Sequence, residues 1–239
     1  TSGSNTYTPH GLPVAVKLFN FAMQLVDTKH HDDLFADSAN ISRMKRQLRT
    51  RRAQQIGLEM VNMALSNGGK QVCRSPALLS IIQEDVCRSI ILLCFNKGGG
   101  DHLLRCSLET FQLLMIHCRT YIKSQIGVFF QKVYLSHLTS ASNQALQWVT
   151  SRQQAMKDGA DNSTNISSSI SGSISNMSNN SRLHMILESL ADLSSHEWLW
   201  MELYANFDCD SSSPNILLPL CKCSGSGSNI YICIHWFIF

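Results

Sequence analysis

The stretch Glu197–Asp210 reads E-W-L-W-M-E-L-Y-A-N-F-D-C-D and predicts a short, aromatic helix that runs into a tight turn. Asn206 tolerates the left-handed conformation that ends many helices, and the aspartates after it can accept hydrogen bonds from nearby backbone N–H groups. Ser213 is then followed by Pro214, the usual order of an N-cap residue and a first helical residue. The stretch therefore predicts a stiff corner between two helices.

Helical periodicity extends outward from this corner through most of the chain. In Pro13–Asp27 the polar residues recur every three or four positions, which leaves most of that helix surface apolar. Ser75 and Pro76 predict the start of another helix, which reaches about Phe95 and has a wholly apolar end that we expect to be buried. Further helices are predicted from about residue 55 to 66, 101 to 123, 125 to 138, 182 to 193 and 197 to 205. The helix from about 125 to 138 is expected to bury Phe129, Phe130, Val133 and Tyr134.

The succession of helices predicts the fold class. Short connections and the lack of an alternating strand pattern favour an all-α domain. Nearly continuous apolar faces with one polar stripe are typical of stacked antiparallel helix pairs, an α-solenoid of the armadillo-like kind. The 239 residues, 44% hydrophobic and 15% charged, supply enough material for a core. Nine cysteines, several within apolar helical patterns, fit a reducing cytosol better than a disulfide framework.

Polar segments interrupt the helices and suggest the domain organisation. Residues 158–181 are almost entirely Ser, Asn, Gly and isolated Ile, which predicts a disordered insertion. The first residue is Thr1, which indicates a fragment or a processed product. The expected order is a disordered start over 1–12, a first helical part over 13–157, the insertion over 158–181, a second helical part over 182–220 and a separate tail over 221–239. The apolar end of that tail is about half the length needed to span a bilayer.

The segment Tyr204–Asp210, read Y-A-N-F-D-C-D and called the box below, carries a family resemblance. It resembles the signature Tyr-x-Asn-(Tyr/Leu/Phe)-Asp-Cys-Asp in the regulatory region of large Golgi-type guanine nucleotide exchange factors for Arf GTPases, the GBF, BIG and GNOM kinds. The similarity extends weakly back through P-A-L-L-S-I-I-Q-E-D-V-C-R at Pro76–Arg88 to about Lys17, and it stops near Leu220. The resemblance implies an armadillo-like regulatory domain that acts in Golgi vesicle-mediated transport.

The same resemblance bears on activity and location. In that family a separate catalytic domain, C-terminal to the box, carries out nucleotide exchange, and this chain has no counterpart of it. We therefore expect the chain to bind and regulate without being an enzyme. The resemblance further implies a place in an Arf GTPase pathway and a cytoplasmic location, peripherally associated with Golgi or endosomal membranes. A free-standing helical-repeat adaptor unrelated to exchange stays open as an alternative, as does a small membrane-tethered protein.

Two explanations of the box stay open. The first is purely structural, a rigid helix–turn–helix corner. The second is a partner-binding surface, since the resemblance implies contacts with a neighbouring regulatory helical domain of the same protein or of a second copy. The candidate partner-binding residues are Tyr204, Asn206, Phe207, Asp208 and Asp210.

A dense basic run is predicted to lie before a helix, at the end of a polar connector over residues 28–50. It consists of Arg43, Lys45, Arg46, Arg49, Arg51 and Arg52. A solvated helix start or loop is one explanation, and contact with an anionic membrane surface is the other, because each basic residue near such a surface contributes about 1 kcal/mol. Nucleic acid is not an expected partner, since the run has no interleaved aromatic side chains and the net charge is only +3.

Motifs for catalysis, metals and cofactors are not found in the sequence. There is no nucleophile elbow, phosphate loop or dinucleotide fingerprint, and Gly98–Gly100 is interpreted as a turn. Asp208 and Asp210 lack the further carboxylates that a hard cation needs, and Cys221-x-Cys223 lacks a second ligand pair at zinc-site spacing. We expect no metal ion and no cofactor.

Overall fold

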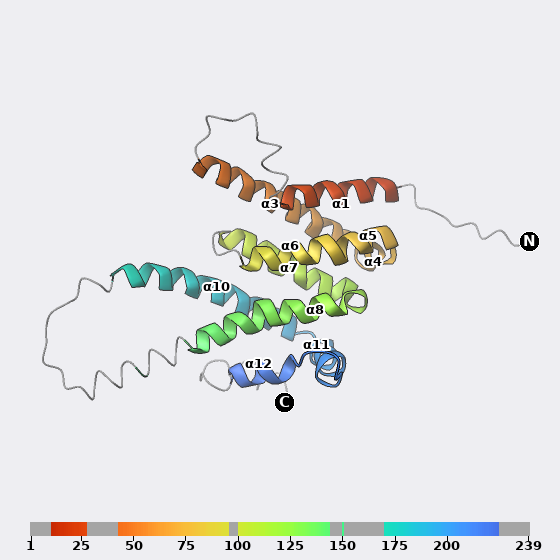
Figure 1. The fold of residues 1–239 in the computed structure, drawn as a ribbon. Coiled ribbons are helices and arrows are strands. Elements are labelled where there is room, and N and C mark those ends of the chain that lie inside the picture. Colours follow the sequence, from red (N-terminus) through yellow and green to blue (C-terminus); the bar gives the residue numbers. More distant parts are fainter. Residues whose placement is uncertain (1–10, 28–42, 96–99, 144–149, 151–169, 225–239) are drawn as a thin grey trace, which may run out of the picture. The chain divides into compact units, whose positions relative to one another are not determined.

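The computed structural model describes residues 11–27, 43–95, 100–143, 150 and 170–224. These residues are helical almost throughout and include no β-strand, so the predicted all-α class is confirmed. The chain divides into two compact units, Thr1–Ile122 and Lys123–Phe239, in each of which helices pack side by side (Figure 1). The predicted stacking of helix pairs is therefore found within the units. The division falls between Ile122 and Lys123.

The first unit is built from helices that pack in pairs. Its helices are α1 (Leu12–Val26), α3 (Arg43–Gly68), α4 (Lys70–Arg74), α5 (Pro76–Ile81), α6 (Cys87–Phe95) and α7 (Asp101–Cys118), with a π-helical turn η2 (Ile82–Val86) between α5 and α6 and a 3₁₀ turn η3 (Arg119–Tyr121) after α7. Helix α3 packs against α1 on one side and α7 on the other, and α6 also packs on α7. The predicted helix from Pro76 to Phe95 is confirmed as one continuous run with the π-helical turn inside it.

Small residues allow α1 and α3 to approach closely. A Cβ atom added to Gly57 would lie 2.6 Å from the carbonyl oxygen of Ala22, so only glycine fits at this crossing. Next to it, the buried Gln54 side chain donates from Nε2 to the carbonyl oxygen of Val26 at 3.1 Å. That bond satisfies a carbonyl that the end of α1 leaves unpaired. The buried side of α3 therefore begins at Gln54 and continues through leucines such as Leu58.

Two cysteines of the first unit come together in its core. The buried Cys73 of α4 lies against Cys118 of α7, and their Cα atoms lie 5.7 Å apart. The turn at Gly69, with φ of +49°, folds α4 back beside α7 and brings the pair together. Burial raises the pKa of Cys87 to about 12. Cys87 is thus the small buried hydrophobe that the sequence predicted.

The second unit contains the aromatic core. Its elements are α8 (Lys123–Phe129), the π-helical turn η4 (Phe130–Leu135), helical residues 136–143, α10 (Ile170–Ser194), α11 (Trp198–Leu203), the π-helical turn η5 (Tyr204–Asp208) and α12 (Leu217–Ser224). The buried rings of Phe129 and Phe130 lie 5.6 and 5.0 Å, centroid to centroid, from Tyr134. The Tyr134 hydroxyl forms a buried 2.9 Å hydrogen bond with Ser189 Oγ, which ties η4 to α10. The predicted burial of these rings is confirmed.

Helix α10 begins earlier than the sequence suggested. Residues 170–181 belong to it, although disorder was predicted over 158–181. Once the apolar side of the later part packs, extending the helix needs no new nucleation, and each added residue gains a backbone hydrogen bond. The rest of that tract, residues 158–169, lies outside the described residues, as do residues 1–10 and 225–239 at the two ends.

Within the ranges that the structure describes, no helix combines the length and the apolar character that crossing a bilayer requires.

Candidate functional site

The corner, defined here as Trp198–Leu217, has one face directed into the second unit and one directed to solvent. Leu199, Leu203 and Phe207 recur every four residues and are buried, with exposed fractions of 0 to 2%. On the other face, 76% of the Met201 surface and 56% of the Tyr204 surface are exposed. The corner therefore buries an aliphatic and aromatic stripe and leaves a methionine and a tyrosine in water.

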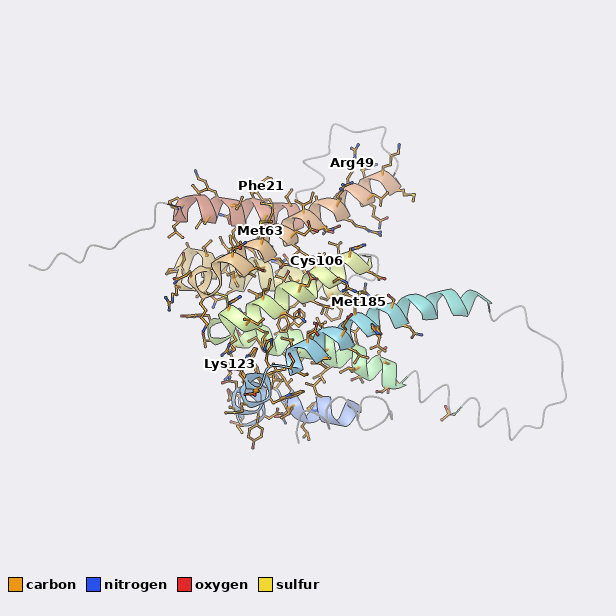
Figure 2. The ribbon with its side chains drawn as sticks, turned by 180° about the vertical axis from the view of Figure 1, so that it is seen from behind. Phe21, Arg49, Met63, Cys106, Lys123 and Met185 are labelled. Carbon is orange, nitrogen blue, oxygen red and sulfur yellow. A yellow bond between two sulfur atoms is a disulfide. The ribbon has the colours of Figure 1, made fainter. Side chains whose placement is uncertain are left out.

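Phe207 fills a space that a glycine keeps open. A Cβ atom added to Gly127 of α8 would lie 2.9 Å from Phe207 Cε1, which is closer than carbon atoms normally approach. The ammonium group of Lys123 lies 5.9 Å from the centre of the same ring, within reach of a cation–π interaction. Figure 2 shows Lys123 beside the corner. Phe207 is thus a core residue of the second unit.

Asp208 caps the helix that follows the corner. Its carboxylate accepts hydrogen bonds from the backbone N–H groups of Ile216, at 3.2 Å, and Leu217, at 2.8 Å. Leu217 is the first residue of α12, so the carboxylate satisfies donors that every helix start leaves unpaired. The sequence prediction that Ser213 caps a helix starting at Pro214 is wrong, because α12 begins three residues later and a more distant carboxylate reaches its donors.

Asp210 organises the turn between η5 and α12. Its carboxylate accepts hydrogen bonds from the Ser212 backbone N–H at 3.0 Å, from Ser212 Oγ at 2.6 Å and from Ser213 Oγ at 2.9 Å. Lys123 Nζ donates to it at 3.0 Å, which adds an ion pair with α8. The Ser212 hydroxyl, the Lys123 ammonium and the remaining donors hold the pKa of Asp210 well below its usual range.

Asn206 and Tyr204 complete the box. Asn206 was predicted to end the helix, but it lies inside η5, where its Nδ2 donates to Glu202 Oε1 at 2.8 Å. The helix instead ends after Asp208, where the Cys209 N–H donates to the Tyr204 carbonyl at 2.9 Å in the wider π-helical pattern. A hydrogen bond with the Cys209 side chain raises the pKa of the Tyr204 hydroxyl.

The candidate residues therefore divide into two groups. The first group is engaged within its own unit and consists of Asn206, Phe207, Asp208 and Asp210. The second is Tyr204, which is the exposed member of the predicted set. Sequence reasoning missed Met201. It precedes Tyr204 by three positions, which places the two side chains on the same helix face, and that spacing was the signal that could have found it.

The basic run lies elsewhere, in the first turns of α3. The sequence prediction that this run precedes the helix, at the end of a connector over residues 28–50, is wrong, because α3 begins at Arg43 and the whole run is helical. The earlier part of that connector, residues 28–42, lies outside the described residues. Lys45, Arg46, Arg49 and Arg52 are exposed, and Arg51 is half-buried. Over the residues that the structure describes, no group of three or more His, Cys, Asp or Glu side chains is arranged to hold a metal ion.

Comparison with known proteins identifies a matching family and two similar proteins. Residues 12–157 match the family model described as "Mon2/Sec7/BIG1-like, HUS domain". The chain is 23% identical over 212 residues to the ARF guanine-nucleotide exchange factor GNOM of Arabidopsis thaliana, which covers 89% of the chain and 12% of GNOM. It is also 23% identical over 208 residues to the ARF guanine-nucleotide exchange factor GNL1 of the same plant, covering 87% of the chain and 12% of GNL1. No solved structure matches the chain significantly.

Proposed function

The chain belongs to the Sec7-like HUS-domain family, and on that premise we propose that it is a non-catalytic regulatory domain that docks another helical domain through the corner. The two relatives reported above are both named as ARF guanine-nucleotide exchange factors, and the chain spans about 12% of their length. The parent protein would accordingly act on an Arf-type GTPase, and this domain would regulate that activity.

The exposed pair Met201 and Tyr204 is the observation that carries the docking proposal. Tyrosine is enriched among the residues that dominate binding energies, and methionine adapts to a partner surface. The pair stands on a support that is fixed from behind by the burial of Phe207 and by the bonds of Asp208 and Asp210. A rigid support lowers the entropy lost on binding. The box would thus provide the frame, and Tyr204 with Met201 would provide the contact.

The partner we propose is a regulatory helical domain, either a neighbour in the same protein or one from a second copy. Asn206, Phe207, Asp208 and Asp210 would contribute to binding through the shape of the corner, since their polar atoms and ring are already used within the second unit. Loss of any of them would then weaken binding by disordering the corner.

The docking test compares two variants of the purified chain with the wild type. Binding to a neighbouring regulatory helical domain of the parent protein, and to a second copy of the chain, is measured by calorimetry, with thermal melting recorded on the same samples. The Met201→Ser/Tyr204→Ser variant should lose at least about tenfold in affinity while its melting temperature changes little. Tyr121→Ser is the matched control, because Tyr121 is a comparably exposed tyrosine in the first unit.

One outcome distinguishes docking from a purely structural corner. Unchanged binding by the folded Met201→Ser/Tyr204→Ser variant would end the docking proposal. Asp208→Ala does not separate the two explanations, because its carboxylate acts through the shape of the corner and binding should fall only in proportion to the unfolded fraction.

Non-catalytic action is tested separately. Release of a fluorescent guanine nucleotide from a purified Arf GTPase should proceed at the same rate with and without the chain. Stimulation well above background would contradict the proposal. In the cell, we expect the parent protein in the cytoplasm, peripherally associated with Golgi or endosomal membranes, where a fluorescent fusion would co-localise with markers of those organelles.

A further inference from the structure

The first turns of α3, Met44–Arg52 and called the free end of α3 below, extend past the part of the helix that packs. Among the described side chains of α3, the first that is buried is Gln54, which bonds to the last turn of α1. Before that point, every side chain from Met44 to Arg49 is exposed. Figure 2 shows Arg49 near the outer end of the helix.

The free end carries a stripe of positive charge. Lys45, Arg49 and Arg52 follow one another at spacings of four and three residues, so they lie on one side of the helix. No acidic residue occurs in the sequence between Arg43 and Leu58. None of the three side chains forms an ion pair with another residue in the described part of the chain.

Local stability does not explain this placement. The first turn of a helix carries a partial positive charge, so basic side chains there are unfavourable by a few tenths of a kcal/mol or more. The first turn of α3 contains no acidic residue that would compensate. Positive charge concentrated at this helix start therefore favours an anionic partner.

Exposed apolar side chains accompany the charges. Met44 is 72% exposed, and Leu48, one turn later, is 55% exposed. Apolar surface left in water is unfavourable, and it is removed from water when a side chain enters the boundary between lipid head groups and acyl chains. The phosphates of a nucleic acid would form ion pairs with the basic side chains, but they would not remove Met44 and Leu48 from water.

We propose that the free end of α3 binds the surface of an anionic lipid bilayer. Lys45, Arg49 and Arg52 contact the lipid head groups, and Met44 and Leu48 insert beside them. This proposal rests on the peripheral membrane association proposed above. It does not depend on docking at the corner, which involves other residues.

The test measures co-sedimentation of the full 239-residue chain with phosphatidylcholine vesicles that contain or lack phosphatidylserine. Binding should require phosphatidylserine and should weaken as salt is added. Each basic residue near the surface is worth about fivefold in partitioning, so Lys45→Ala/Arg49→Ala/Arg52→Ala should lower it by about 100-fold. Arg88→Ala, an exposed arginine on α6, is the matched control and should bind as the wild type does.

The apolar contribution is tested with a second matched pair. Leu48→Gln should weaken vesicle binding several-fold, whereas Leu92→Gln should not, because Leu92 is similarly exposed but lies on α6 away from the basic stripe in sequence. Circular dichroism of each variant checks that the helices are retained. The alanine substitutions should leave the signal unchanged, because alanine is the strongest helix former.

Several results would overturn the proposal. Equal binding to vesicles with and without phosphatidylserine would show that the basic side chains do not drive membrane binding. Binding to double-stranded DNA or RNA that is tighter than vesicle binding and is unaffected by Leu48→Gln would assign the free end to nucleic acid instead. The Met201→Ser/Tyr204→Ser variant should bind vesicles normally, so a failure of the docking proposal and a failure of this one give different patterns.

Discussion

The corner and the free end of α3 are both rich in charged side chains, yet they use them differently. At the corner, Asp208 and Asp210 accept hydrogen bonds from backbone and hydroxyl groups of their own unit and from Lys123. At the free end, Lys45 and Arg49 are exposed and extend from a helix segment that precedes the packed part. This difference shows that a high proportion of charged residues in a stretch of sequence does not indicate whether those charges are available to a partner. What matters is whether donors or acceptors of the same unit lie within reach.

Side-chain length explains part of the contrast. A short aspartate just after a helix can only reach nearby groups, and at the corner those include unpaired N–H groups at the start of α12. Long lysine and arginine side chains at a helix start extend into water, and they find no unpaired acceptors there, since helix starts expose donors. Structural and partner-directed roles can therefore be separated by mutation.

The largest expected effect compares the buried stripe of the corner with the free end. Phe207→Ala should lower the free energy of unfolding of the second unit by about 3–5 kcal/mol, because it removes a buried ring and leaves a cavity against Gly127. Leu48→Ala should change stability by less than about 0.5 kcal/mol. Urea unfolding followed by circular dichroism and tryptophan fluorescence measures both. Similar small values for the two variants would show that the corner is not packed.

A smaller effect is expected from the cap of α12. Asp208→Ala leaves the N–H groups of Ile216 and Leu217 without their acceptor and should cost about 1–2 kcal/mol. Asp208→Asn keeps one side-chain oxygen as acceptor and should cost less. The same unfolding measurements rank the two variants. If alanine and asparagine were equally harmless, α12 would not depend on this carboxylate.

The smallest effect is a pH dependence. The folded-state pKa of Asp210 lies below its ordinary value of 3.8, so the unfolded chain takes up the proton first as the pH falls. The contribution of Asp210 to stability is therefore complete above about pH 4 to 5 and is lost as the pH falls through the folded pKa. Because the carboxylate is close to solvent and screened, we expect a small change.

Unfolding curves recorded across this pH range test the assignment. Asp210→Asn should remove part of the stability loss on acidification. Arg49→Ala is the control from the free end and should leave the pH profile unchanged, because Arg49 forms no ion pair with another described residue. A wild-type profile for Asp210→Asn would mean that the bonds around this carboxylate do not persist in solution.

Much of the fold could be predicted from the local spacing of apolar and polar residues, because a helical repeat indicates which face of a segment is apolar. It predicted the all-α class, the helix from Pro76 to Phe95 and the buried rings of Phe129 and Tyr134. Pattern did less well with helix ends. Helix α3 begins at Arg43, and α10 begins at Ile170 within a tract that lacks an apolar repeat. Such ends depend on continuation from a packed segment, which local composition does not encode.

The sequence by itself determined that a corner exists near residue 206 and that its residues suit turns and caps. Only the tertiary structure decided which neighbours they meet. Phe207 packs on Gly127 of a helix much earlier in the chain, Asp208 caps a helix that starts at Leu217, and Cys73 lies against Cys118. The physical reason is that periodicity specifies the face on which a side chain lies, whereas its partner depends on which distant backbone the packing brings within reach.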